Sequence, residues 1–218
     1  MEKILQISGE GRILVLPEIA VVNFPLESLD YEYDQAIANL NQVVSNLKII
    51  FEKHGIEEQC IRTRNFLINK QKEKDLKSGS EHFKGYRASL DISVSMVFNH
   101  TLLKNVLSDI AQEINEGEFH LRFKPSNSGK CRNEALEKAI DHAVKTASLI
   151  ARKMGLTLSG IRNIDYSCSS EEILSPEFVL FLTRESDMYY ANIEAEEVNV
   201  VETIDITWSI QESEEEKA

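Results

Sequence analysis

The feature that most restricts the fold is a long helix pattern that ends at a glycine and leads into a strand pattern, and it occurs twice. The stretches KHGIEEQCIR and KMGLTLSGIR, which begin at Lys53 and Lys153, place Lys, Gly, an aliphatic residue, Ile and Arg at the same spacings. Gly55 and Gly155 stand where a helix commonly closes in a left-handed conformation. The chain therefore predicts two similar helix-strand units. A general preference for Lys and Gly at helix-to-strand junctions would explain the same match.

Apolar patterns with helical spacing precede both glycines. The first covers residues 36–51, where apolar side chains recur at steps of three and four. The second covers residues 131–154, where small alanines allow close approach to a sheet or another helix. Its predicted inward face consists of Ala135, Ala139, Ile140, Ala143, Ala147, Ile150 and Ala151. Thr101 is the predicted N-cap of a shorter helix that ends near Gly117.

Alternating or continuous apolar runs predict the strands. They cover residues 4–16, 19–26, 61–68, 86–98, 119–123, 161–166 and 198–210. Pro17 and Pro25 are expected to limit the first two strands. The charged stretch at 70–85 predicts a mobile hairpin connection. Residues 167–192 mix serines and acids with the apolar run FVLFL, and no structure is predicted for them.

Size and charge exclude several classes of protein. A chain of 218 residues that is 42% hydrophobic can bury a substantial core, and we expect one structural unit with two lobes over residues 1–210. A net charge of −12 repels polyphosphate backbones and anionic lipid head groups, so no nucleic-acid partner is expected. The like charges of QESEEEKA predict a solvated, disordered tail at 211–218.

Side chains that usually bind metals or catalyse reactions are scattered along the chain. No CxxC, HxH, HExxH or G-x-S-x-G pattern occurs, so no catalytic residue, cofactor or metal site is predicted. The residues concerned are Cys60, Cys131, Cys168, His54, His82, His100, His120 and His142. Without a signal peptide or an apolar run of about 20 residues, we expect a soluble cytoplasmic protein, or a periplasmic one if a leader was removed.

The pair Gly9 and Gly11 in ISGEGRILVLPE suggests a phosphate-binding loop at first sight. Such a loop needs a helix directly after the glycines, because the free N–H groups of the helix N-terminus meet the anion. Here β-branched and aliphatic residues and Pro17 follow instead. The pair therefore predicts a bulge or a sharp bend within a strand.

Two basic strips stand out in this acidic chain. Arg62 and Arg64 share one face of a predicted strand, and His120, Arg122 and Lys124 share one face of another. If the strips converge, they could hold a small anion or an acidic segment of a partner subunit. The alternative is that both are ordinary charged strand faces exposed to water.

The order of these motifs resembles the SIMPL domain family over about residues 4–210. The resemblance lies in ISGEGRILVLPEIAVV, GIEEQCIRTRNFLI, GYRASLDISVSM, EALEKAIDHAVKTASLIARKMG and the closing ITWSI. It implies an α+β fold in which an antiparallel sheet is backed by long helices. It also implies large ring-like or channel-like homo-oligomers and no established reaction. Members are described in terms of stress tolerance, cell-surface antigenicity or, in animals, association with a signalling kinase.

This sequence departs from the family pattern in two places. It lacks the export signal of most bacterial members, and it has IEAEEV where members often place a Pro-Gly turn before the last strand. We expect a non-enzymatic, self-assembling structural or interaction protein, in which the apolar strand faces and the segment FVLFLTRESDMYY supply subunit contacts. The alternative is a protein or enzyme that binds a small ligand on the basic strips.

Overall fold

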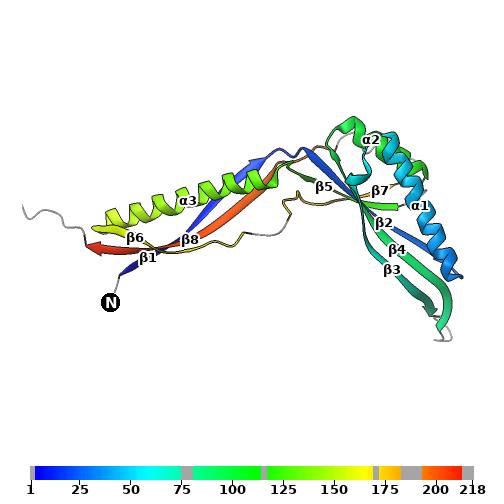
Figure 1. Cartoon of the computed structure of the whole chain (residues 1–218), viewed down its shortest axis with the longest axis horizontal. Coiled ribbons are helices and arrows are strands. Elements are labelled where there is room, and N and C mark those ends of the chain that lie inside the picture. Colours follow the sequence, from blue (N-terminus) through cyan, green and yellow to red (C-terminus); the bar gives the residue numbers. More distant parts are fainter. Residues whose placement is uncertain (1–2, 75–80, 114–116, 169–171, 183–192, 213–218) are drawn as a thin grey trace, which may run out of the picture. The chain divides into compact units, whose positions relative to one another are not determined.

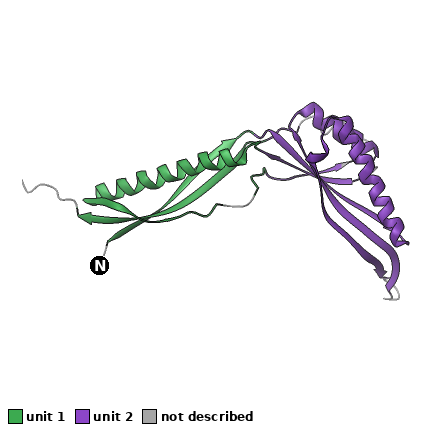
Figure 2. Ribbon diagram, viewed as in Figure 1, with its two compact units in different colours: residues 1–16, 125–175, 196–218 green, residues 17–124, 176–195 purple. Residues whose placement is uncertain are grey.

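The computed structural model describes residues 3–74, 81–113, 117–168, 172–182 and 193–212, and these fold into two compact units (Figures 1 and 2). The first, here the three-stranded unit, comprises Met1–Leu16, Pro125–Ser175 and Glu196–Ala218. The second, the five-stranded unit, comprises Pro17–Lys124 and Pro176–Ala195. Each combines an antiparallel sheet with one or two helices, so the predicted α+β fold is confirmed.

The three-stranded unit is a sheet covered on one face by a single long helix. Its elements are β1 (Ile4–Val15), α3 (Ser128–Lys153), β6 (Leu156–Asp165) and β8 (Val198–Glu212). The strand order is β1-β8-β6, and both pairings are antiparallel. Helix α3 begins after Asn127, whose side-chain oxygen accepts a hydrogen bond from the Lys130 N–H at 2.9 Å.

The five-stranded unit has a larger sheet whose helices pack on one face. Its elements are β2 (Ile19–Asp30), α1 (Tyr33–Lys53), the short 3-10 helix η1 (Glu58–Cys60), β3 (Ile61–Lys74), β4 (Glu81–Val97), α2 (His100–Glu113), β5 (Gly117–Lys124) and β7 (Phe178–Leu182). The strand order is β3-β4-β2-β5-β7, with every pairing antiparallel. Large apolar side chains from both helices and three strands form its core, including Leu40, Phe51, Leu107, Ile110, Phe24, Ile92 and Phe119.

Both units contain the same β-α-β-β arrangement. In the five-stranded unit the order along the chain is β2, α1, β3, β4, and in the three-stranded unit it is β1, α3, β6, β8. In each sheet the third strand of the set lies between the second and the first. Gly55 (φ 72°) and Gly155 (φ 65°) follow the two helices in the left-handed conformation. The prediction of two similar helix-strand units is confirmed.

The glycine pair of β1 serves close packing against α3. Pairing between β1 and β8 runs without a register shift from Ile4 to Val15, so the predicted bulge is wrong. A Cβ atom on Gly9 would lie 2.1 Å from the Ala139 carbonyl oxygen, and one on Gly11 would lie 1.9 Å from that of Ala135. The predicted close approach of the alanines is therefore confirmed, and the glycines make it possible.

The buried face of α3 is narrower than its sequence predicts. Alanines at every fourth position are buried, namely Ala135, Ala139, Ala143, Ala147 and Ala151. Ile140, which was predicted to face inward, is 38% exposed, and Ile150 is only half-buried. Close approach to glycines selects a single row of small side chains, and the larger aliphatic residues lie beside that row.

Several element limits also differ from the sequence prediction. Pro25 lies inside β2, at a point where β2 pairs with β4 but no longer with β5. Asn99, not Thr101, caps α2, because its side-chain oxygen accepts the Leu102 N–H at 3.1 Å. Strands β3 and β4 extend into the predicted hairpin connection. Three stretches lie outside the described residues: 75–80 of that connection, the part of FVLFLTRESDMYY that follows β7, and the tail at 213–218. Strand β8 continues to Glu212.

A charged contact joins the C-terminal end of α1 to α2. Asp109 Oδ2 lies 2.8 Å from Lys53 Nζ and 2.8 Å from His54 Nε2. The hydrogen bond from Lys53, followed by that from His54, lowers the pKa of Asp109 below its ordinary value of 3.8. A lowered pKa in the folded state means that the ionised carboxylate stabilises the protein above its unfolded-state pKa. That contribution is lost as the pH falls through the folded-state pKa.

We therefore expect Asp109→Asn to destabilise the protein in a pH-dependent way. At pH 7 the loss should be about 0.5–1 kcal/mol, because the contact is partly exposed. At a pH below the lowered pKa of Asp109, where the wild-type carboxyl group also becomes protonated, the difference should disappear. Urea unfolding of both proteins between pH 2 and 8 measures this. A difference that stays constant over the whole range would contradict the assignment.

Candidate functional site

All five predicted basic residues lie on the face of the five-stranded sheet opposite to the helices, here called the outer face. Phe119, Leu121 and Phe123 of β5 are completely buried in the core. Because side chains alternate along a strand, His120, Arg122 and Lys124 point the other way. On β3, Arg62 and Arg64 pair in register with Ser93 and Asp91 of β4, which share that outer face. The two strips were predicted on different strands, and they belong to one surface.

Arg64 and His120 line one hollow on the outer face, here called the polar hollow. Strands β4 and β2 lie between their strands. The register row of His120 runs through Asn23 and Ser93, and Arg64 lies on the next row of the same face, opposite Asp91. The hollow has a volume of about 320 Å³. Its lining consists of Asn23, Pro25, Arg64, Asn65, Asp91, Ser93, His120 and Glu177. Arg62, Arg122 and Lys124 are not part of this lining.

Carboxylates neutralise much of the positive charge on β5. Arg122 Nη2 lies 3.0 Å from Glu177 Oε1, and His120 Nε2 lies 3.1 Å from Glu118 Oε1. His120 Nδ1 is 3.4 Å from Glu177 Oε2 without the alignment of a hydrogen bond. By contrast, within the described part of the chain no carboxylate pairs with Arg62 or Arg64. The free positive charge of the polar hollow therefore lies on the β3 side.

A β-bulge shapes the β3 side of the polar hollow. Arg64 pairs with Asp91 and Leu67 pairs with Ser89, so two residues of β3 stand opposite one residue of β4. Within the bulge, Asn65 adopts a positive φ of 54°. Its side-chain N–H donates to Asp91 Oδ2 at 2.7 Å. This bond orients the Asp91 carboxylate and withholds one of its oxygens from Arg64.

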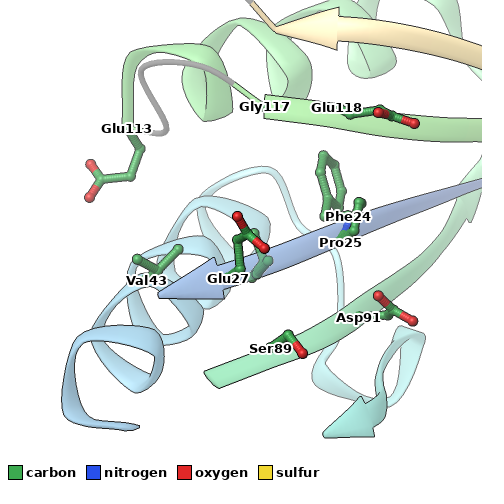
Figure 3. A pocket seen from close by; sticks show the side chains of 10 residues that line it. Phe24, Pro25, Glu27, Val43, Ser89, Asp91, Glu113, Gly117 and Glu118 are labelled. Carbon is green, nitrogen blue, oxygen red and sulfur yellow. The ribbon is translucent and has the colours of Figure 1, made fainter. Parts of the chain in front are cut away.

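A larger, acidic pocket of about 500 Å³ adjoins the polar hollow and shares Pro25 and Asp91 with it (Figure 3). Proline has no N–H to donate, and β2 ends its pairing with β5 at Asn23, before Pro25. The separation of the two strands opens this pocket. Three further carboxylates line it, from Glu27, Glu113 and Glu118. In Figure 3, Glu118 and Glu27 lie near Phe24 and Pro25, and Glu113 lies farther away, above Val43.

Other chemistry finds little support in the described residues. Within them, no three His, Cys, Asp or Glu side chains come close enough to hold a metal ion. None of the three cysteines forms a disulfide. The described helices are too short or too polar to cross a membrane.

A buried polar cluster in the three-stranded unit was not predicted from the sequence. Glu202 of β8 is only 3% exposed. Its Oε1 accepts a hydrogen bond from Arg132 Nη1 at 2.8 Å, and its Oε2 accepts one from the Tyr166 hydroxyl at 3.2 Å. Burial, a hydrogen bond with Cys168 and the nearby Glu202 charge raise the pKa of Tyr166 to about 12. The sequence signal is that Glu202 interrupts the apolar alternation of VNVVETIDITWSI.

The fold and the two polar clusters define an α+β protein built from two β-α-β-β units. The chain belongs to the SIMPL family, described as "Protein of unknown function (DUF541)", whose model matches residues 5–208. It is 25% identical over 197 residues to the "Uncharacterized protein YggE" of Edwardsiella ictaluri (strain 93-146). That match covers 90% of this chain and 77% of the relative. The family relationship assigns no reaction to the polar hollow or to the buried cluster.

Among solved structures, a partial similarity is found to a crystal structure of a larger protein. It is the crystal structure of a "putative amidohydrolase/peptidase" from Burkholderia cenocepacia, at 12% sequence identity and a TM-score of 0.18. The match covers 68% of this chain and 34% of that one, so this chain spans about a third of its length. A similarity at this level supports no statement about fold or function.

Proposed function

We propose that this protein is a non-enzymatic, self-assembling structural or interaction protein whose copies meet through an apolar surface of the three-stranded unit. The surface, here called the apolar strip, consists of Ile140 and Val144 of α3 and Ile161 and Ile164 of β6. Their exposed fractions are 38%, 43%, 56% and 54%. This group of exposed aliphatic side chains is the observation that carries the proposal.

The position of α3 leaves the apolar strip open. Ile161 and Ile164 pair in register with Trp208 and Ile206 of β8, which are buried beneath the helix alanines. Strand β6 forms the edge of the sheet, and its two isoleucines on the helix-covered face stay exposed. On α3, the His142 ring accepts the Glu10 N–H at the opposite, β1 edge. Ile140 and Val144 therefore lie on the flank of α3 away from β1.

A second copy of this chain suits the apolar strip better than another partner does. The chain has a net charge of −12, and the four residues of the strip contain no acid. Two copies can therefore bury these four side chains against one another without burying an acidic residue of the strip. A two-fold axis would place Ile161 of one copy against Ile164 of the other and the reverse, which is a self-complementary contact. Assembly in stress tolerance remains an expectation from the family resemblance.

The solution mass tests this proposal. Wild-type protein at about 50 μM should show a multiple of 24.8 kDa by light scattering coupled to size exclusion. The double variant Ile161→Glu and Ile164→Glu should raise the dissociation constant at least about 100-fold, because it places charges at the centre of an apolar contact. Val201→Glu is the matched control, since Val201 is 39% exposed on the opposite face of the sheet. A wild-type monomer, or equal dissociation of the control, would overturn the proposal.

A further inference from the structure

We propose that the polar hollow binds a small zwitterion of the α-amino acid class, with the ligand carboxylate on Arg64 and its ammonium group on Asp91. This binding is independent of assembly through the apolar strip, because the polar hollow belongs to the five-stranded unit.

Two opposite charges stand side by side in the polar hollow without neutralising each other. Arg64 and Asp91 are register partners on adjacent strands, so their side chains leave the sheet as close neighbours on one face. No ion pair forms between them, and the amide of Asn65 occupies one Asp91 oxygen instead. A ligand that carries a carboxylate and an ammonium group on one carbon atom matches this pair of charges. The planar guanidinium of Arg64 can hold the carboxylate through two parallel hydrogen bonds.

The walls of the polar hollow are fixed before a ligand arrives. On one side the left-handed Asn65 holds the Asp91 carboxylate in place. On the other side the Glu118 carboxylate lies 3.1 Å from His120 Nε2 and holds the ring. Ser93, which is 8% exposed, offers a hydroxyl group between them. Fixed polar groups on both sides reduce the entropic cost of ordering the site on binding.

The size and charge of the lining favour a zwitterion over other ligands. A volume of about 320 Å³ lies at the lower end of the range for small-molecule sites. Asp91, whose carboxylate has no cationic partner among the described residues, would repel a ligand that carries negative charge alone. Arg64, without a carboxylate partner in the described residues, would repel a ligand that carries positive charge alone. Only a ligand with both charges satisfies both sides of the polar hollow.

Nuclear magnetic resonance titration of the full chain with each of the L-α-amino acids tests the proposal. At least one amino acid should give saturable shifts of the Asn65, Asp91 and Ser93 amide signals. Its deaminated and decarboxylated analogues, such as propionate and ethylamine for L-alanine, should bind at least about tenfold more weakly. Arg64→Gln and Asp91→Asn should each weaken binding by a similar factor. Arg62→Gln is the matched control, because Arg62 is exposed on the same strand face but does not line the polar hollow.

Three results would overturn the proposal. The first is that no amino acid shifts these signals at about 10 mM. The second is that propionate binds as tightly as L-alanine, which would indicate a simple anion site. The third is that Arg62→Gln weakens binding as much as Arg64→Gln. The solution mass of the same samples separates this test from that of assembly, because loss of binding in Arg64→Gln should leave the mass unchanged.

Discussion

Replacement of Gly11 by alanine is expected to lower the free energy of unfolding of the three-stranded unit by about 3–5 kcal/mol. The new Cβ atom would lie 1.9 Å from the Ala135 carbonyl oxygen and 2.4 Å from the Ala139 backbone nitrogen. Both atoms belong to the backbone of α3, so no side-chain rotation can relieve the overlap. Either the helix moves away from β1 and loses its packing, or the strand leaves its register with β8.

Trp208 makes this loss measurable within the unit concerned. It is the single tryptophan of the chain, and its side chain is 5% exposed in the core beneath α3. Urea unfolding followed by tryptophan fluorescence therefore reports on the three-stranded unit. Gly129→Ala is the matched control, since a Cβ there would meet only the Asn127 side-chain oxygen, at 3.6 Å. Gly129→Ala should raise the free energy of unfolding by between zero and about 1 kcal/mol. A Gly11→Ala protein within 1 kcal/mol of wild type would refute the close contact.

The glycine pair also shows how far the sequence could predict this fold. The absence of a helix after Gly11 correctly excludes a phosphate loop, because that question depends on neighbouring residues. The purpose of the glycines depends on α3, whose first residue is Ser128. Periodicity could predict the alanine row and the strand separately. No residue near the glycines in the sequence indicates that the strand packs directly on the alanine row, so the sequence favours a bulge instead.

For the polar hollow, too, the sequence predicts the features that depend on neighbouring residues and not those that depend on distant ones. Alternation along β5 correctly places His120 and Arg122 opposite the buried phenylalanines. The carboxylate that pairs with Arg122 belongs to Glu177, which lies just before β7 in a stretch without a periodic pattern. The bulge at Asn65 depends on the register between β3 and β4, which no pattern within IRTRNFLI reveals. Sequence reasoning could therefore find the basic residues, but not the carboxylates that pair with some of them and leave others unpaired.

Arg132→Met should produce the second large loss of stability, again in the three-stranded unit. The change removes the guanidinium that lies 2.8 Å from Glu202, whose side chain is 3% exposed. Of the two hydrogen bonds to Glu202 described above, the one from the Tyr166 hydroxyl would then remain. A neutral donor does not compensate a buried charge. Removal of one member of a buried ion pair typically costs about 3–5 kcal/mol. Trp208 fluorescence during urea unfolding measures this loss as well.

The double variant Arg132→Met and Glu202→Leu separates the buried charge from simple loss of packing. Replacement of the whole pair by apolar side chains of similar volume is often neutral or stabilising, so the double variant should recover most of the stability. Lys138→Met is the matched control on the same helix, because its 3.8 Å contact with Glu134 is exposed and should contribute less than about 0.5 kcal/mol. If the double variant is as unstable as Arg132→Met alone, Arg132 acts through its packing. Recovery would instead show that the buried Glu202 carboxylate, on an otherwise apolar strand face, requires an arginine on the sheet-facing side of α3.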